Sequence, residues 1–159
     1  MNNIKQQENI ILSNHIKSIE AYAFSGCTLL KTISLSDNVM YIGDCAFERC
    51  YSLENISFSK SLNKIGNLAF FDCISLKEIV LPSSVETIGF SAFCNCPLLT
   101  KIYLPKNIKN IGRKVFFGCS KLTIFCEANK KPDSWSEDWN IYDNSGNGCN
   151  VVWGYKLDK

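Results

Sequence analysis

The sequence contains no apolar run that could cross a membrane. A membrane-spanning helix needs roughly 18 or more consecutive apolar residues, and no stretch of these 159 residues approaches that length. The first residues, MNNIKQQEN, are polar where a signal peptide would carry its hydrophobic region. We therefore expect neither a membrane span nor a signal peptide in this chain.

Histidine is nearly absent, since His15 is the only one. The sequence sets no serine or cysteine nucleophile beside it, which argues against a catalytic triad or a histidine-based metal site. The pair Cys94 and Cys96 resembles half of a metal site, but no second pair follows at zinc-finger spacing. The sequence therefore predicts no catalytic residue, no cofactor and no metal, and the protein is not expected to be an enzyme.

Neither sign of charge dominates, because 17 basic residues oppose 15 acidic ones and leave a net charge of +2. This balance gives no overall attraction to nucleic acid, which is not expected as a partner. Residues 97–125 differ, since they hold six basic residues and no acidic one. A sulfated glycan or RNA would be attracted to this segment, unless the acidic residues of 133–143 neutralise it. The candidate polyanion-binding residues are Lys106, Lys109, Arg113 and Lys114.

What the sequence does contain is a unit repeated five times at a period of 23 residues. Each unit holds an aliphatic residue, an isoleucine three residues later, a small residue followed by phenylalanine, and then a cysteine and a leucine. The phenylalanines are Phe24, Phe47, Phe70, Phe93 and Phe116, and the cysteines are Cys27, Cys50, Cys73, Cys96 and Cys119. A fixed period of this length is the signature of a solenoid.

One unit can be translated into local structure. Residues 76–82 alternate inward and outward positions, as a strand does, and Pro82 ends them. A second extended stretch follows at 85–89, and the Ala-Phe pair with its cysteine then predicts a tight helical or 3-10 turn. Glycine recurs at Gly43, Gly66, Gly89 and Gly112, where the backbone needs a positive φ or a close approach. The fold class is therefore a repeat solenoid, mainly β, with short helical or 3-10 turns and two narrow parallel sheets.

Five of the nine cysteines follow the repeat, so they belong to the core instead of a disulfide framework. Strands lie about 4.8 Å apart, which permits bonding between neighbouring cysteines. Their side chains should run parallel, however, and buried cysteine packs well as a hydrophobe, so we predict reduced thiols. Cys45, Cys94, Cys126 and Cys149 lie outside this column, and their redox state stays open.

The repeat consensus L-x-x-I-x-L-P-x-x-V-x-x-I-G-x-x-A-F-x-x-C, found over residues 10–125, resembles that of the BspA-like leucine-rich repeats. This resemblance implies a right-handed leucine-rich repeat solenoid without catalytic activity. It also implies a secreted or cell-surface protein that adheres to extracellular-matrix or host surface proteins, such as fibronectin and fibrinogen. An intracellular interaction scaffold is the alternative.

The period divides the chain into three parts. Residues 1–15 form a polar arm and a partial first coil, residues 16–125 the five repeats, and residues 126–159 a cap. The cap contains Trp135, Trp139 and Trp153, which would cover the last coil or, alternatively, line a carbohydrate site. The first coil leaves a strand edge open, which allows an edge-to-edge homodimer or further upstream repeats.

Two surfaces are candidates for partner binding. The first is apolar and holds Phe71 and Phe117, which share one column with Cys94, together with Phe90. These rings would alternatively form a secondary core beneath the turn. The second is the face of the first strand of each coil. There the period places Tyr103 and Cys126 in one outward column and Glu78, Lys101 and Ile124 in another, and the contact set is Glu78, Lys101 and Tyr103.

Overall fold

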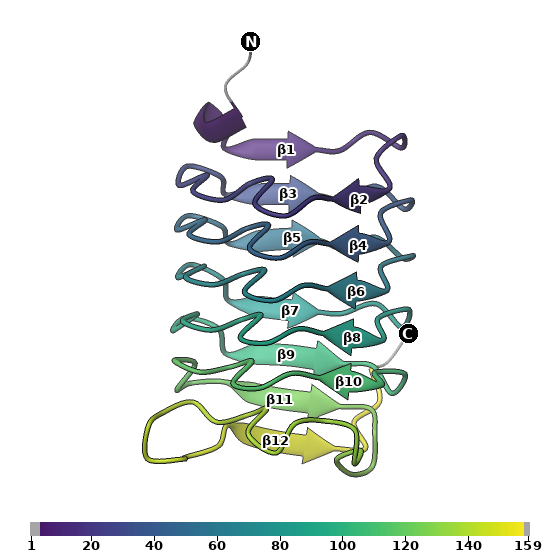
Figure 1. The fold of residues 1–159 in the computed structure, drawn as a ribbon, viewed down its shortest axis with the longest axis vertical. Helices are drawn as coiled ribbons and strands as arrows, with labels where there is room; N and C mark the ends of the chain where they lie inside the picture. Colours follow the sequence, from purple (N-terminus) through teal and green to yellow (C-terminus); the bar gives the residue numbers. More distant parts are fainter. Residues whose placement is uncertain (1–3, 158–159) are drawn as a thin grey trace.

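The computed structural model describes residues 4–157 and shows a ladder of short strands stacked along one axis (Figure 1). Each coil contributes one strand to each of two columns. The first column contains β1 (Asn9–Ile11), β3 (Thr32–Ser34), β5 (Asn55–Ser57), β7 (Glu78–Val80), β9 (Lys101–Leu104), β11 (Thr123–Cys126) and β12 (Asn150–Trp153). The second column contains β2 (Ser18–Ile19), β4 (Tyr41–Ile42), β6 (Lys64–Ile65), β8 (Thr87–Ile88) and β10 (Asn110–Ile111). A 3-10 helix, η1 (Ile4–Gln6), precedes β1.

All strand pairs between coils are parallel, and most are in register at the 23-residue period, as in the pairing of Ile42 with Ile65. The second column is one continuous sheet in the order β10-β8-β6-β4-β2. The first column is divided into a sheet β1-β3-β5 and a sheet β12-β11-β9-β7. The predicted β-solenoid with narrow parallel sheets is confirmed, with this one division added.

The division coincides with Phe58, which stands where the neighbouring coils have Leu35 and Leu81. The two leucines are buried, whereas the larger Phe58 is half-buried. Its ring packs edge-on against Phe70, with the ring centroids 6.1 Å apart. Ile56 on β5 is also only half-buried, although Ile79 at the same repeat position is buried. Within residues 4–157 no strand pairing joins β5 to β7.

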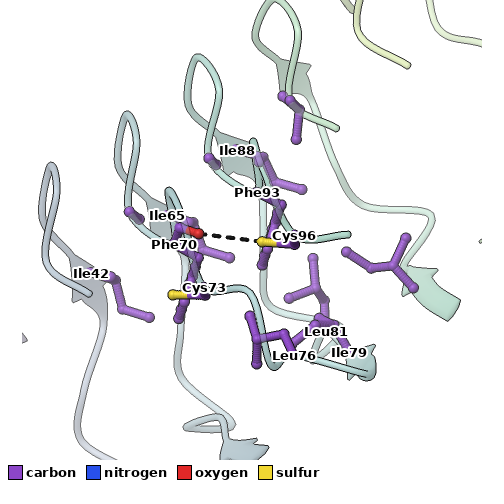
Figure 2. Packing of buried hydrophobic residues seen from close by; sticks show 14 of the residues in the cluster. Ile42, Ile65, Phe70, Cys73, Leu76, Ile79, Leu81, Ile88, Phe93 and Cys96 are labelled. Carbon is purple, nitrogen blue, oxygen red and sulfur yellow. Dashed lines mark hydrogen bonds between the residues drawn. The ribbon is translucent and has the colours of Figure 1, made fainter. Parts of the chain in front are cut away.

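The core is a stack of identical side chains along the axis. Phe24, Phe47, Phe70 and Phe93 lie ring over ring at 5.1 Å, and Phe116 follows at 6.0 Å. Columns of isoleucine and leucine line the same interior (Figure 2). Burial of each ring stabilises the fold by about 1.5–3 kcal/mol. Because every coil buries its apolar face only against its neighbours, the solenoid depends on contacts between adjacent repeats.

The expected tight turn lies between the second strand and the cysteine. In it the N–H of Cys50 donates to the carbonyl of Phe47, three residues earlier, at 3.2 Å. Other N–H groups reach the next coil, as Phe47 does to the carbonyl of Ala69 at 2.8 Å. The hydrogen bonds have the i to i+3 spacing of a 3-10 turn, but the segment continues into no helix.

The glycine column allows coils to approach closely. An added Cβ at Gly89 would lie 2.6 Å from the main-chain nitrogen of Asn67, and one at Gly66 would lie 2.6 Å from the carbonyl carbon of Gly43. Neither glycine has a positive φ. Of the two reasons for glycine at these positions, the structure therefore supports the close approach.

The ladder cysteines have a hydrogen-bonding role that their periodicity did not reveal. The thiol of Cys96 donates to the main-chain carbonyl of Phe70 at 3.4 Å (Figure 2), and that of Cys50 donates to Phe24 at 3.2 Å. Burial raises the pKa of Cys73 and of Cys96 well above the usual range. All nine cysteines carry free thiols.

The last strand of the repeats corrects the predicted register. The period places Phe125 in the core and Ile124 and Cys126 on the surface. Instead β11 pairs with β9 through Phe125 and Tyr103, a step of 22 residues, and Ile124 and Cys126 are buried. One residue fewer separates Leu122 from the strand, and a shift of one residue turns every side chain of a strand to the other face.

Residues 127–157 pack on the last coil. The indole N–H of Trp135 donates to the carbonyl of Ile108 at 3.1 Å, and Trp139 packs edge-on against Phe116 at 6.1 Å. Trp135 and Trp139 are buried, so neither ring offers a face to a sugar, whereas Trp153 is half-buried and lies 6.1 Å from both. β12 pairs parallel to β11. The role of this segment as a cap stays a prediction.

Candidate functional site

The exposed face of the sheet β12-β11-β9-β7 carries a cluster of three aromatic rings. Tyr103 on β9 stacks on Phe125 on β11 with the centroids 4.9 Å apart and the planes 16° from parallel. After β12 the chain turns back, and Tyr155 joins them at 5.5 Å from Tyr103 and 5.0 Å from Phe125. All three residues are half-buried, so part of each remains in contact with solvent.

The alternation of strand residues explains why these rings face outward. Ile102 and Leu104 on β9 and Ile124 and Cys126 on β11 point into the core, so the residues between them, Tyr103 and Phe125, lie on the other face. The main-chain N–H of Tyr155 donates to the carbonyl of Cys126 at 2.9 Å and holds the third ring beside them.

A groove of about 220 Å³ lies at the carboxyl ends of these strands. Its lining is mostly apolar and comes from three coils and the final segment: Val80, Leu81, Pro82, Ser83, Tyr103, Leu104, Pro105, Phe125, Glu127, Tyr155 and Leu157. Two of these side chains, Val80 and Leu157, are more than 40% exposed, at 44% and 41%. We call these residues the aromatic groove.

A second hollow of about 530 Å³ adjoins the aromatic groove and shares Ser83, Glu127, Tyr155 and Leu157 with it. The remaining lining residues are Lys106, Asn107 and Lys156. The carboxylate of Glu127 accepts the main-chain N–H of Lys106 at 3.1 Å. We call this second hollow the basic hollow.

The three residues predicted to form a contact set on the strand face, Glu78, Lys101 and Tyr103, lie together in the structure. Glu78 and Lys101 are paired in register on β7 and β9, and Tyr103 is on the same face as Lys101. Glu78 and Lys101 are exposed, and Tyr103 belongs to the aromatic groove. Phe125 was not among the predicted contact residues because the predicted register of β11 was wrong, and Tyr155 was not among them because it follows the last repeat. The alternation of Ile124 with Phe125 was the available signal for the first.

The apolar candidates Phe71, Phe90 and Phe117 lie apart from this groove. Phe71 and Phe117 are half-buried in the turns, and the ammonium of Lys114 lies 5.4 Å from the centre of the Phe117 ring. Phe90 is 47% exposed, in a different column of the turn. These three rings therefore do not form one continuous surface with the aromatic groove.

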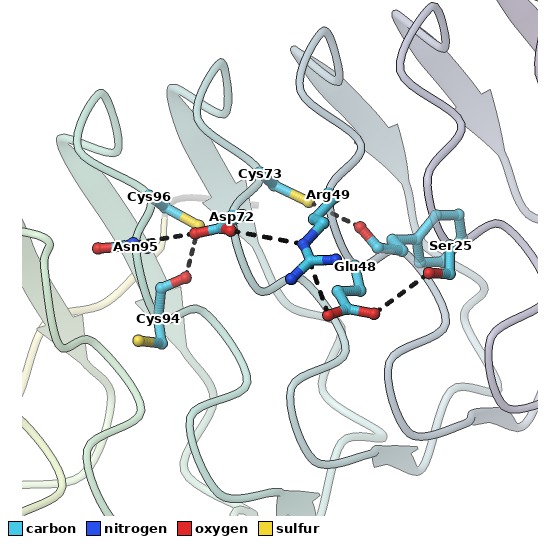
Figure 3. A network of polar contacts seen from close by, with 9 residues as sticks. Ser25, Glu48, Arg49, Asp72, Cys73, Cys94, Asn95 and Cys96 are labelled. Atoms are coloured by element: carbon cyan, nitrogen blue, oxygen red, sulfur yellow. Dashed lines mark hydrogen bonds and ion pairs between the residues drawn. The ribbon is translucent and has the colours of Figure 1, made fainter.

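Polar contacts surround Asp72, the residue that follows Phe71 in its turn (Figure 3). Arg49 lies 3.8 Å from Glu48 and 4.0 Å from Asp72, and the side-chain amide of Asn95 donates to Asp72 at 2.9 Å. The main-chain N–H of Arg49 donates to the carbonyl of Phe71 at 2.8 Å. This network joins three successive coils, so its side chains already have partners within the chain.

The basic candidates divide into paired and unpaired residues. Lys109 forms an ion pair with Glu86 at 2.8 Å, and its hydrogen bond lowers the pKa of Glu86. Arg113 pairs with Asp138 at 3.1 Å. Lys114 lies over Phe117. Lys106, in the basic hollow, makes no ion pair in the described part of the chain.

The described residues do not gather groups for metal binding, since no three His, Cys, Asp or Glu side chains among residues 4–157 are placed to hold an ion. His15 is exposed in the first coil. Burial raises the pKa of Cys94, the most accessible thiol, to about 11, which opposes formation of a nucleophilic thiolate at neutral pH.

No helix in residues 4–157 has the length and apolar character needed to cross a membrane.

A model of the BspA-type leucine-rich repeat region matches residues 2–123 in six copies. The chain belongs to the BspA-type leucine-rich repeat family. This confirms the resemblance read from the repeat consensus. The BspA-type fold is that of a protein-interaction module, and leucine-rich repeat proteins generally bind other proteins.

Solved structures agree with this family. A T. pallidum leucine-rich repeat protein is 33% identical with a TM-score of 0.72, and the match covers 74% of this chain and 58% of that one. A Bacteroides ovatus leucine-rich repeat protein is 35% identical with a TM-score of 0.71, covering 77% and 32%. A leucine-rich cell surface protein from Faecalibacterium prausnitzii is 28% identical with a TM-score of 0.72, covering 88% and 34%. This BspA-type chain thus spans at most 58% of the length of these three proteins. No curated protein matches it.

Proposed function

We propose that this BspA-type chain is a non-enzymatic protein-binding module that acts in adhesion or surface interaction. The observation that carries the proposal is the aromatic groove formed by Tyr103, Phe125, Tyr155 and the apolar residues around them. Tyrosine and other aromatic residues in partly desolvated pockets contribute much of the binding energy of protein interfaces. The groove lies on the exposed face of a sheet whose strands are fixed by neighbouring coils, so it is preorganised for binding.

The surface role rests on the similarity to a cell surface protein and on the family resemblance. Under this proposal the partners are extracellular-matrix or host surface proteins. An intracellular scaffold would use the same groove with different partners. Protease accessibility of the native protein on intact cells distinguishes the two, because an adhesin is removed by external protease and a scaffold is not.

The test is binding of the purified chain to an array of extracellular-matrix proteins, fibronectin and fibrinogen among them, at low and physiological salt. Tyr103→Ala and Tyr155→Ala each remove one ring of the groove, and we expect either to weaken binding about 30-fold or more. Tyr51→Ala is the matched control, because Tyr51 is an exposed tyrosine on a distant turn. Phe71→Ala tests the rival apolar surface.

The proposal is wrong if no array protein binds, or if binding survives both groove substitutions and is lost with Phe71→Ala. Salt sensitivity addresses the polyanion alternative. Binding held by aromatic burial persists at physiological salt, whereas binding to a sulfated glycan through basic residues falls steeply.

A further inference from the structure

The aromatic groove and the basic hollow form one continuous surface with two different chemistries. Ser83, Glu127, Tyr155 and Leu157 line both, so a ligand can occupy them together. The groove side is apolar and aromatic, while the hollow adds Lys106 and Lys156. A ligand that fills both must therefore combine an apolar part for the aromatic groove with a polar or charged part for the basic hollow.

The size of the aromatic groove suits one large side chain. Small-molecule and cofactor sites are commonly about 300–1,000 Å³, and this groove is smaller, at about 220 Å³. Anchoring side chains at protein interfaces fill pockets of this kind. We therefore treat the groove as the receptor for a single residue of a partner.

The polarity of the groove argues against a sugar. Apart from the tyrosines, Ser83 and Glu127 are the only polar side chains in its lining, and Glu127 already accepts the N–H of Lys106. A sugar has hydroxyl groups all around its ring, and these few polar side chains could replace only part of the hydrogen bonds to water that it would lose, which is costly. An apolar side chain has no such groups to satisfy.

The charged side chains that line the basic hollow are Lys106, Lys156 and Glu127, and the two lysines outweigh the single carboxylate. Lys106 and Lys156 are exposed and make no ion pair in residues 4–157. Other basic residues of this region form ion pairs within the chain, Lys109 with Glu86 and Arg113 with Asp138. The two unpaired lysines are therefore complementary to carboxylates on a partner.

We propose that this surface binds an extended acidic segment of a protein, with one aromatic or leucine side chain in the aromatic groove and neighbouring carboxylates against Lys106 and Lys156. The inference rests on the proposed function and adds the chemistry of the partner. An extended segment fits because it can place its side chain and its charges along the two adjoining hollows at once.

The test is selection of peptides from a random library displayed on phage, followed by measurement of the affinity of synthetic copies by fluorescence anisotropy. The expected peptides combine an aromatic residue or leucine with nearby aspartate or glutamate. We expect Tyr103→Ala to weaken their binding about 30-fold. The double substitution Lys106→Glu with Lys156→Glu is expected to weaken it roughly tenfold at low salt and less at high salt.

Matched controls separate these effects from general changes in charge or stability. Lys60→Glu with Lys64→Glu changes the net charge equally, at exposed lysines outside both hollows. Tyr51→Ala removes an exposed tyrosine elsewhere. Both controls should leave peptide affinity unchanged, and thermal unfolding of every variant shows whether it is folded.

Several results would overturn the inference. The inference is wrong if the library yields no peptide, or if the selected peptides contain no acidic residues. It is also wrong if the double substitution Lys106→Glu with Lys156→Glu leaves the affinity of the peptides unchanged. Heparin binding that needs these lysines but not Tyr103 would also overturn it, in favour of a sulfated glycan. If a matrix protein binds and depends on Tyr103 but not on the two lysines, the proposed function stands and this inference alone fails.

Discussion

The thiol of Cys73 donates a hydrogen bond to the main-chain carbonyl of Phe47, 3.1 Å away in the preceding coil. The same contact joins Cys50 to Phe24, Cys96 to Phe70 and Cys119 to Phe93. The cysteine in four of the five repeats thus fills space and donates a hydrogen bond to a carbonyl of the neighbouring turn. Both contributions are buried, so removal of the thiol should affect the stability of the stack.

Replacement of Cys73 by alanine should lower the free energy of unfolding by about 1–3 kcal/mol, because it leaves a cavity and removes one of the two hydrogen bonds to the Phe47 carbonyl, which keeps the N–H of Cys50. Urea denaturation of the reduced protein measures the loss. Cys94→Ala is the control, since Cys94 is only half-buried and lies outside the ladder. Equal stability of Cys73→Ala and the unaltered protein would show that the ladder contact contributes nothing.

Stability should decrease at high pH. Burial raises the pKa of the Cys50 thiol to about 12, so this thiol stays neutral in the folded protein when it ionises in the unfolded chain. The contribution of Cys50 to the free energy of unfolding is complete below the pKa of an unfolded cysteine, about 8.5. It is lost as the pH rises from there towards the raised pKa of about 12. Each such thiol adds a slope of up to about 1.4 kcal/mol per pH unit.

Urea denaturation at several pH values between roughly 8 and 11 tests this dependence, because this range lies between the pKa of an unfolded thiol and the raised pKa of Cys50 in the folded protein. Cys50→Ala should make the slope shallower, although it lowers stability at neutral pH. A slope that is the same with and without Cys50 would contradict the prediction.

The aromatic stack allows a comparison between adjacent residues. Phe70 is fully buried between Phe47 and Phe93, whereas Phe71 is half-buried in the turn. Phe70→Ala should cost about 3–5 kcal/mol, and Phe71→Ala should cost clearly less. Thermal unfolding of the two variants decides the point. If both cost the same, Phe71 is core, and its use as a binding surface is excluded.

The glycine column predicts a steric effect. Gly89→Ala would place a Cβ 2.6 Å from the backbone of Asn67 in the preceding coil, so the coils must separate, at a cost of about 1–3 kcal/mol or more. Gly146→Ala is the comparison, because no atom lies within 4 Å of its added Cβ, although its φ of 80° is strained for alanine. A smaller loss at Gly89 than at Gly146 would show that the close approach is unimportant.

Most of the fold was predictable because the repeat places each residue type at a constant position. The columns of Phe70, Cys73 and Gly66 each imply a buried or close-packed site, and the structure has them there. The exceptions occur where the period fails. One missing residue after Leu122 exchanges the faces of Ile124 and Phe125, and apolar residues on both faces made the two registers look alike.

The candidate site was only partly predictable for the same reason. Tyr103 lies within the repeats and its face could be deduced from alternation. Tyr155 lies beyond them, and its position depends on the return of the chain after β12, which no period describes. The free charge of Lys106 was likewise hidden, because the sequence does not show that Glu86 and Asp138 neutralise other basic residues.

The division between β5 and β7 gives the solenoid different mechanical properties on its two sides. The sheet from β2 to β10 is continuous, while the opposite column is joined across the division by side chains alone, through the packing around Phe58 and the ion pair of Lys77 with Glu54 at 2.9 Å. We expect bending of the rod to concentrate at this level, with the continuous sheet as the hinge. We therefore expect the segment with the aromatic groove to tilt relative to the first coils, while the turns stay joined through bonds such as that of the Phe70 N–H to the carbonyl of Ala92.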